Sequence, residues 1–222
     1  MKSQMKRLNK STPADPAWIE KRTRGYLPHW ERDGGTYFIT FRLYDSLPQP
    51  VLDQIARQRA VLARARQTRK LLPTEAVTAE QLNRKKIEAY LDSGYGECFL
   101  RHPEAAALVA DSLRFRDGQR YTLHAWCIMP NHVHVLCELF SGQKLTPIVG
   151  GWKSFTVRKI NAILHRKGQV WQHESFDHLI RNEREFNRAV EYIANNPAKA
   201  GLIGWRWVFV RQGARFAASA ST

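Results

Sequence analysis

The segment that most constrains the fold is a predicted β-hairpin in the middle of the chain. Residues 121–139 hold two runs rich in apolar and β-branched side chains, separated by a Pro130-Asn131 turn. Side chains alternate between the two faces of a strand, so His132 and His134 point to one face and the residues between them to the other. Two imidazoles side by side on a rigid strand can hold a divalent ion. The hairpin therefore predicts a sheet with one apolar face and one face that carries a histidine pair.

A helix near the C-terminus is predicted to lie against the histidine-bearing face. Asn182, with Glu185 three residues later, matches a helix cap, and an apolar stripe follows over residues 186–194. Tyr192 and Asn196 are neighbours one turn apart and lie away from the centre of that stripe. The helix is expected to end at the proline that follows Asn196. A histidine pair alone is more often two half-exposed side chains than a metal site, so the position of this tyrosine and asparagine is what strengthens the prediction.

The other periodic segments predict an α+β fold. In chain order they are a strand over 37–43, helices over 50–72 and 78–91, a helix after Pro103, a helix from Thr146-Pro147, a short strand between 169 and 180, and a closing strand over 205–210. Together with the hairpin, this order predicts a ferredoxin-like βαββαβ antiparallel sheet with a helical insertion after the first strand.

A chain of 222 residues is long enough for one well-buried domain and short for two. We expect a flexible basic arm over residues 1–23, a single domain over 24–212 with a helical insertion at about 50–95, and a disordered tail over 213–222.

Composition indicates a polyanionic partner. Lysine and arginine number 35 against 20 acidic residues, a net charge of +15, and nucleic acid is the partner that such an excess favours. A basic surface without a ligand is the alternative. The three cysteines show no paired spacing, and no run in the sequence has the length and apolarity of a membrane span, so we expect a cytoplasmic protein with reduced thiols and no membrane partner.

Several motifs in a fixed order carry a family resemblance. They span about residues 24 to 205 and comprise Arg24-x-x-Leu27-Pro28-His29-Trp30, Tyr37-Phe38-Ile39-Thr40-Phe41-Arg42, Met129-Pro130-Asn131-His132-Val133-His134, Trp171-Gln172 with Asp177-His178 and Arg181, and Tyr192-Ile193-x-x-Asn196-Pro197 followed by Ala200-Gly201-Leu202. The chain resembles the REP-associated tyrosine transposases, which are domesticated bacterial relatives of the insertion-sequence transposases in the single-tyrosine HUH nuclease superfamily.

The resemblance implies a role for each matching residue. His132 and His134 correspond to the metal-binding histidine pair, Tyr192 to the nucleophile, and Asn196 to a third metal ligand, where mobile-element relatives usually carry glutamine. The implied cofactor is a divalent metal, Mg²⁺ or Mn²⁺. The implied activity is that of a single-stranded DNA endonuclease and strand transferase, which acts at REP-type palindromic hairpins through a 5′-phosphotyrosine intermediate.

Two other functions stay open, and both keep the fold. A binding-only protein would retain the basic surface without cleavage. A rolling-circle replication initiator or relaxase usually has a lysine after the tyrosine, whereas this chain has Asn196 one turn later. The resemblance implies a monomer whose own Tyr192 completes its own site, with a dimer that exchanges the tyrosine helix as the alternative.

Five residues are predicted to contact DNA. Basic side chains would neutralise phosphates, and an aromatic ring would stack on an exposed base of the unpaired flank. The candidates are Arg24, Lys153, Arg158, Trp171 and Arg181. For the tryptophan the alternative is a place in the core, and for the basic residues it is surface ion pairs.

Overall fold

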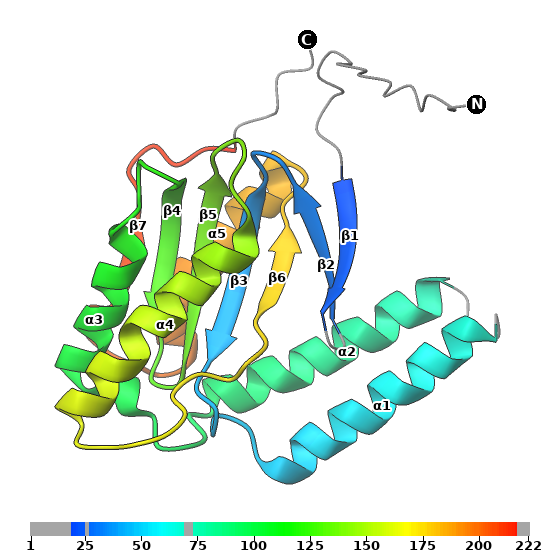
Figure 1. Ribbon diagram of the computed structural model, residues 1–222, viewed down its shortest axis with the longest axis horizontal. Helices are drawn as coiled ribbons and strands as arrows, with labels where there is room; N and C mark the ends of the chain where they lie inside the picture. Colours follow the sequence, from blue (N-terminus) through cyan, green and yellow to red (C-terminus); the bar gives the residue numbers. More distant parts are fainter. Residues whose placement is uncertain (1–18, 25–26, 69–72, 217–222) are drawn as a thin grey trace, which may run out of the picture.

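The computed structural model describes residues 19–24, 27–68 and 73–216 and contains a five-stranded antiparallel sheet (Figure 1). The strand order is β6-β3-β5-β4-β7, and every neighbouring pair is antiparallel. The bounds are β3 Thr36–Arg42, β4 Tyr121–Ile128, β5 His132–Leu139, β6 Phe176–Leu179 and β7 Val208–Val210.

Three helices cover the two faces of this sheet. Helices α3 (Pro103–Arg114) and α4 (Leu145–Ile163) lie on one face, and α5 (Glu183–Lys199) lies on the other (Figure 1). Along the chain, β3, α3, β4, β5, α4 and β6 follow one another in the predicted βαββαβ order. The α+β, ferredoxin-like prediction is therefore confirmed.

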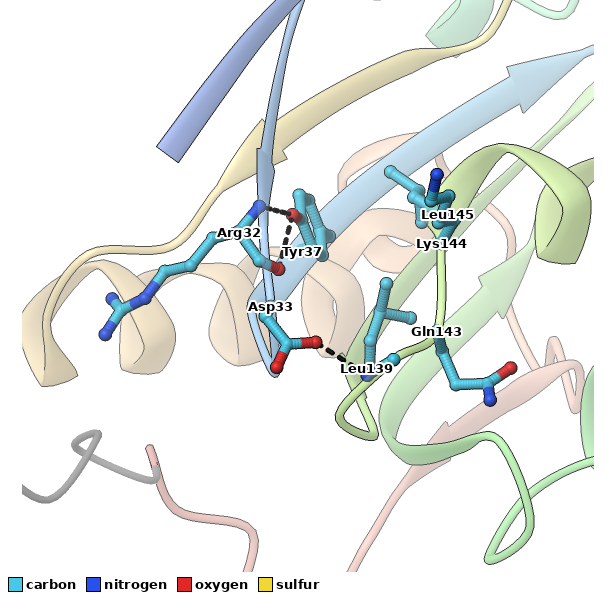
Figure 2. Close-up of a pocket in the computed structure, with 8 residues that line it drawn as sticks. Arg32, Asp33, Tyr37, Leu139, Gln143, Lys144 and Leu145 are labelled. Atoms are coloured by element: carbon cyan, nitrogen blue, oxygen red, sulfur yellow. Dashed lines mark hydrogen bonds between the residues drawn. The ribbon is translucent and has the colours of Figure 1, made fainter. Parts of the chain in front are cut away.

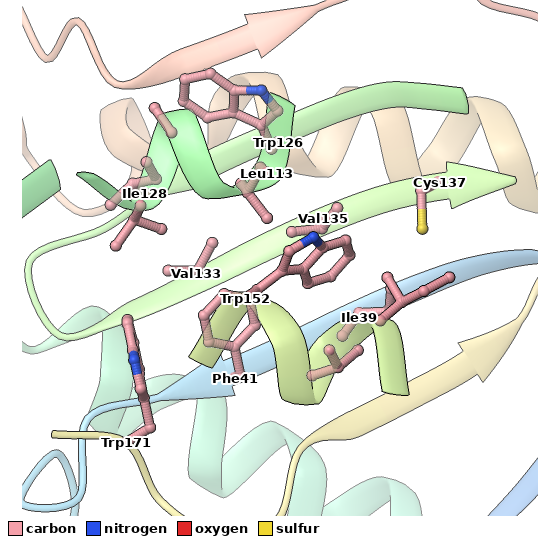
Figure 3. Close-up of a cluster of buried hydrophobic side chains, with 14 of the residues drawn as sticks. Ile39, Phe41, Leu113, Trp126, Ile128, Val133, Val135, Cys137, Trp152 and Trp171 are labelled. Atoms are coloured by element: carbon pink, nitrogen blue, oxygen red, sulfur yellow. The ribbon is translucent and has the colours of Figure 1, made fainter. Parts of the chain in front are cut away.

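The main hydrophobic core fills the space between the sheet and helices α3 and α4 (Figure 3). Val133 and Val135 of β5 face this core, as the alternation predicted, and both are fully buried. The ring of Phe41 lies 4.9 Å from that of Trp171 in an edge-to-face arrangement and 6.3 Å from that of Trp152. Aromatic contacts of this kind add to the free energy that burial alone provides.

Two further helices occupy the region of the predicted insertion. Helix α1 (Gln49–Gln67) and helix α2 (Pro73–Asp92) follow β3 and extend side by side beyond one end of the sheet (Figure 1). A short 3₁₀ turn, η1 (Phe99–Arg101), returns the chain to α3. Within the described residues, no helix is long and apolar enough to cross a membrane.

The N-terminal part differs from the prediction. Residues 1–18 of the expected arm lie outside the described residues, but β1 (Ile19–Arg24) pairs with β2 (Leu27–Arg32) in a separate antiparallel hairpin. Charged residues interrupt any apolar alternation there, so the hydrophobic pattern could not indicate these strands.

Three other boundaries also differ. The fourth strand is limited to β6, and Trp171 contributes only an isolated bridge to Leu43. The closing strand begins three residues later than predicted, at Val208. Helix α5 continues past Pro197 for two residues, because a proline removes one hydrogen bond near the helix end while its fixed φ remains compatible with helix.

Residues 217–222 of the expected tail lie outside the description, whereas Phe216 packs against Phe186 of α5.

Candidate active site

Strand β5 places two histidines side by side on the face that α5 covers. His132 is fully buried and His134 is 1% exposed. Their Nε2 atoms are 3.0 Å apart, and their rings are nearly perpendicular. The two nitrogens therefore converge on one point beneath the helix.

The other ring nitrogen of each histidine is held by a neighbouring residue. Asn131 donates from Nδ2 to the carbonyl of Tyr95, so its Oδ1 accepts from His132 Nδ1 at 2.7 Å. This tautomer leaves a lone pair on His132 Nε2. Thr40 Oγ1 lies 2.8 Å from His134 Nδ1, and its hydroxyl can rotate to donate or accept. Such contacts orient imidazoles for ligation.

Burial sets the charge of His132. Removal from water disfavours the imidazolium and lowers the pKa of His132 to about 3. The ring is therefore neutral at physiological pH, which is the form that binds a metal ion.

Helix α5 begins where the sequence predicted and adds two side chains to the site. Asn182 caps it, with Oδ1 accepting from the amide of Glu185 at 2.9 Å. Tyr192, in the second half of this helix, is half-buried, and its ring centroid lies 5.2 Å from that of His134. The tyrosine and the histidine pair thus meet across the interface between helix and sheet.

Asn196 occupies the buried side of the helix, which differs from the prediction. The sequence pattern places it away from the centre of the apolar stripe, yet it is 1% exposed. The buried face of the helix therefore extends beyond its apolar residues. Neither Oδ1 nor Nδ2 of Asn196 has a hydrogen-bond partner among the described residues. A buried amide without partners is unfavourable and indicates a ligand.

Helix α5 is also tied to the helical insertion. Lys199, two turns after the tyrosine, pairs with Asp92 at the end of α2 with 2.7 Å between Nζ and Oδ2. Its Nζ lies 5.7 Å from the centroid of the Tyr192 ring. A cation therefore lies near the tyrosine in this structure.

The predicted DNA contacts fall in different places. Trp171 is only 4% exposed, its Nε1 donates to Thr156 Oγ1, and its ring packs on Phe41. The prediction that it stacks on an exposed base is therefore wrong, because the ring fills the core. Lys153 is half-buried and donates to the carbonyl of His173 at 2.9 Å.

The remaining three candidates lie on other segments of the chain than the histidine pair. Arg158 is exposed on α4, across the sheet from the histidine pair. Arg181 is exposed just before α5, where its backbone amide donates to Glu185. Arg24 is the last residue of β1, and its side chain lies outside the description. DNA contacts by these three residues stay predictions.

A small cavity lies elsewhere, at the N-terminus of α4 (Figure 2). Its volume is about 60 Å³, and Tyr37, Asp33 and Leu145 are among the residues that line it. The Asp33 carboxylate already accepts from Ser141 Oγ and the amide of Gly142, contacts that lower its pKa. The polar groups here satisfy one another, so the cavity is not a candidate active site.

The sequence prediction missed the residues that orient the histidines. Thr40 pairs with His134 in the register of β3 and β5, and Asn131 directly precedes the first histidine. Phe38, two residues before Thr40, stacks on His134 with 5.4 Å between centroids. The alternation of β3 could have placed Phe38 and Thr40 on one face, but only the strand register brings them to β5.

Known proteins are similar to the part of the chain that holds these residues. Residues 113–196 match the family model described as transposase IS200 like. The matched segment is similar to IS200-like transposases and covers less than half of the chain. His132, His134, Tyr192 and Asn196 all lie within the matched range.

Two relatives are similar to part of this chain. A REP-associated tyrosine transposase of Escherichia coli is 24% identical over 91 residues, which are 41% of this chain and 53% of that protein. A relative from Haemophilus influenzae is 28% identical over 89 residues, 36% of this chain and 51% of its own. The chain thus spans about half the length of the curated relatives it matches. The resemblance to the REP-associated tyrosine transposases predicted from the motifs is confirmed.

A solved structure is also similar to this chain. It is a REP-associated tyrosine transposase bound to a REP hairpin, with 18% identity and a TM-score of 0.46. The match covers 85% of this chain and 81% of the other.

Proposed function

We propose that this chain is a metal-dependent endonuclease and strand transferase for single-stranded DNA, with Tyr192 as the nucleophile. The observation that carries the proposal is that the Tyr192 ring lies 5.2 Å from the ring of His134, whose Nε2 is 3.0 Å from Nε2 of His132. One turn later on the same helix, the Asn196 amide is buried without a hydrogen-bond partner among the described residues. The proposed substrate is a REP-type palindromic hairpin with an unpaired flank. The names of the similar proteins, REP-associated transposases and one bound to a REP hairpin, support that choice.

The proposed reaction is a transesterification. Tyr192 Oη attacks the phosphorus of a phosphodiester, a new phosphotyrosine ester forms with the 5′ phosphate of the downstream fragment, and the bond from phosphorus to the 3′ oxygen of the upstream fragment breaks. The tyrosine proton passes to solvent and the leaving oxygen takes one up as a 3′ hydroxyl. Because the ester retains the energy of the broken bond, the 3′ hydroxyl of another strand can reverse the step and join new ends.

The residues fit a divalent ion. Two nitrogens bound to one ion at about 2.1 Å in adjacent octahedral positions are about 3.0 Å apart, and the two Nε2 atoms have this separation. Within the described part of the chain, no third histidine, cysteine or carboxylate joins the pair. Asn196 Oδ1 is the oxygen donor that would complete the set. Mg²⁺ or Mn²⁺ held by these residues would supply charge neutralisation at a non-bridging phosphate oxygen.

The packing of α5 supports a monomer. Tyr192 lies against His134 of its own chain, and Asp92 of α2 holds the end of the same helix through Lys199. One copy therefore brings Tyr192 to the histidine pair, and Asn196 lies one turn later on the same helix. A cytoplasmic location remains a prediction, as does the absence of a membrane partner.

The covalent intermediate provides the direct test. Labelled single-stranded oligonucleotides that carry genomic palindromes are incubated with the protein, with and without Mn²⁺, and resolved under denaturing conditions. We expect a protein–DNA adduct that carries the 5′ end of the downstream fragment, needs Mn²⁺ and maps to the peptide with Tyr192. Tyr192→Phe keeps the ring packing and removes the attacking oxygen, so the adduct should vanish while binding survives.

Matched variants and substrates separate the alternatives. Tyr90→Phe removes a hydroxyl from helix α2 and should leave the adduct intact. An adduct that persists in Tyr192→Phe would assign the nucleophile to another residue. Binding without any cleavage by the parent protein would favour the binding-only alternative, and equal cleavage of perfect duplex DNA would exclude hairpin specificity.

A further inference from the structure

A groove lies on the opposite face of the sheet from Tyr192. It runs between the C-terminal end of α3 and the middle of α4, with a volume of about 260 Å³. The residues that define it are Phe115, Arg116, Arg120, Tyr121, Trp152 and Phe155.

The floor of the groove is fixed by a chain of hydrogen bonds. Trp152 Nε1 donates to Tyr121 Oη at 2.8 Å, and Tyr121 Oη donates to the carbonyl of Leu113 at 2.7 Å. The two floor rings meet edge to face with 5.4 Å between centroids. Both are almost fully buried, so this surface is preformed.

Two exposed phenylalanines form the sides. Phe115 is 69% exposed and Phe155 is 46% exposed, although rings of this size normally avoid water. Each carries a cation above it, with Arg116 Cζ 4.7 Å from the Phe115 centroid and Lys159 Nζ 4.3 Å from the Phe155 centroid. The groove thus combines apolar ring faces with positive charge.

The charge of the groove is not neutralised locally. No carboxylate is among the residues that line it. Arg116 donates to the amide oxygen of Gln119, and neither Arg116 nor Arg120 forms an ion pair within the described part of the chain. A second copy of this chain, at a net charge of +15, would be repelled from such a surface.

We infer that this groove is a second nucleic-acid site, which binds unpaired nucleotides of single-stranded DNA. Bases would stack on Phe115 and Phe155, and the arginines would neutralise the adjacent phosphates. A paired base in a duplex has no free face for these rings, so the site selects single strands. The inference rests on the proposed function only for the choice of DNA. Because the sheet separates the groove from Tyr192, one strand can be held at a distance from its cleavage point.

The test measures binding without cleavage. Tyr192→Phe protein with a chelator is titrated against a labelled oligothymidine of about ten nucleotides, a length suited to one single-strand groove. We expect Phe115→Ala and Phe155→Ala each to weaken binding about tenfold, because loss of one stacking ring removes that much affinity. Phe155→Trp should keep or increase the affinity, and Phe155→Leu should weaken it as the alanine does.

The controls distinguish stacking from other causes. Ile203→Ala, at a fully exposed apolar residue, should leave binding unchanged. An oligomer with abasic positions should bind the parent weakly and respond little to Phe115→Ala. Equal affinity of parent and both alanine variants for oligothymidine would overturn the inference. It would also fall if the variants changed only self-association, or only the binding of an acidic peptide. Since cleavage is blocked throughout, none of these outcomes depends on Tyr192 being the nucleophile.

Discussion

The two faces of the sheet differ in what they bury. Between the sheet and α3 and α4, strands β3 and β5 contribute Ile39, Phe41, Val133 and Val135, all apolar and at most 1% exposed. Against α5, the same strands place the half-buried Thr40 and the buried histidine pair among apolar residues such as Phe38 and Leu136. Buried polar groups that lack partners lower stability, and natural chains tolerate them where function requires it. Both faces therefore contribute apolar packing, but only the face against α5 also buries the histidine pair.

The largest expected difference between the faces is in stability. Phe41→Ala should lower the free energy of unfolding by about 3–5 kcal/mol, because it leaves a cavity between Trp152 and Trp171. Denaturant unfolding followed by circular dichroism measures this change. The matched control, Phe115→Ala, removes the same ring from an exposed position and should change stability little. Equal destabilisation by both would show that the apolar face is not the principal source of stability.

Metal affinity should depend on the opposite face. Thr40→Val keeps the shape of the side chain but removes the hydroxyl that orients His134. We expect Mn²⁺ affinity to fall by about tenfold to a hundredfold, the usual effect of losing such an orienting contact. Titration calorimetry with Mn²⁺ measures it. Thr36→Val makes the same substitution on the same strand, at a buried threonine, and should bind Mn²⁺ as the parent does. An unchanged affinity in Thr40→Val would exclude this orienting role.

Sequence patterns predicted the apolar face better than the polar one. The alternation in β3 and β5 gave the core residues and the fold, because period-two burial is local information. The histidine pair and Tyr192 came from motifs, whereas Thr40 and Asn131 were missed. Their roles depend on strand register and on a turn, which no periodicity encodes. Trp171 was misassigned for a related reason: a tryptophan near arginines has the same sequence pattern whether its ring faces solvent or core.

Acid should destabilise the protein through the polar face. Burial lowers the pKa of His132 to about 3, below its ordinary value of 6.5. Between these values the unfolded chain binds more protons than the folded one, so stability rises with pH across this window and is lost as pH falls toward 3. One such group contributes a slope of up to about 1.4 kcal/mol per pH unit. We expect His132→Gln, measured by denaturant unfolding with a chelator present, to reduce the slope.

The control for the acid response is an exposed imidazole. His173 lies at the surface, and His173→Gln makes the same substitution outside the buried histidine pair. An identical slope in the parent and in His132→Gln would mean that other groups account for the acid sensitivity.

The smallest expected effect has the opposite sign to that of a core mutation. Asn196 is buried with both amide atoms unpartnered, so Asn196→Leu replaces an unsatisfied group with an apolar one of similar size. Without metal, this change should raise the free energy of unfolding by about 1 kcal/mol. Saturating Mn²⁺ should reverse the order, because an ion that binds only the folded state stabilises the parent more than a variant that has lost one ligand. Thermal unfolding with and without Mn²⁺ measures both states. If Asn196→Leu were destabilising without metal, the amide would have a hydrogen-bond partner in the folded protein, and its assignment as a metal ligand would fail.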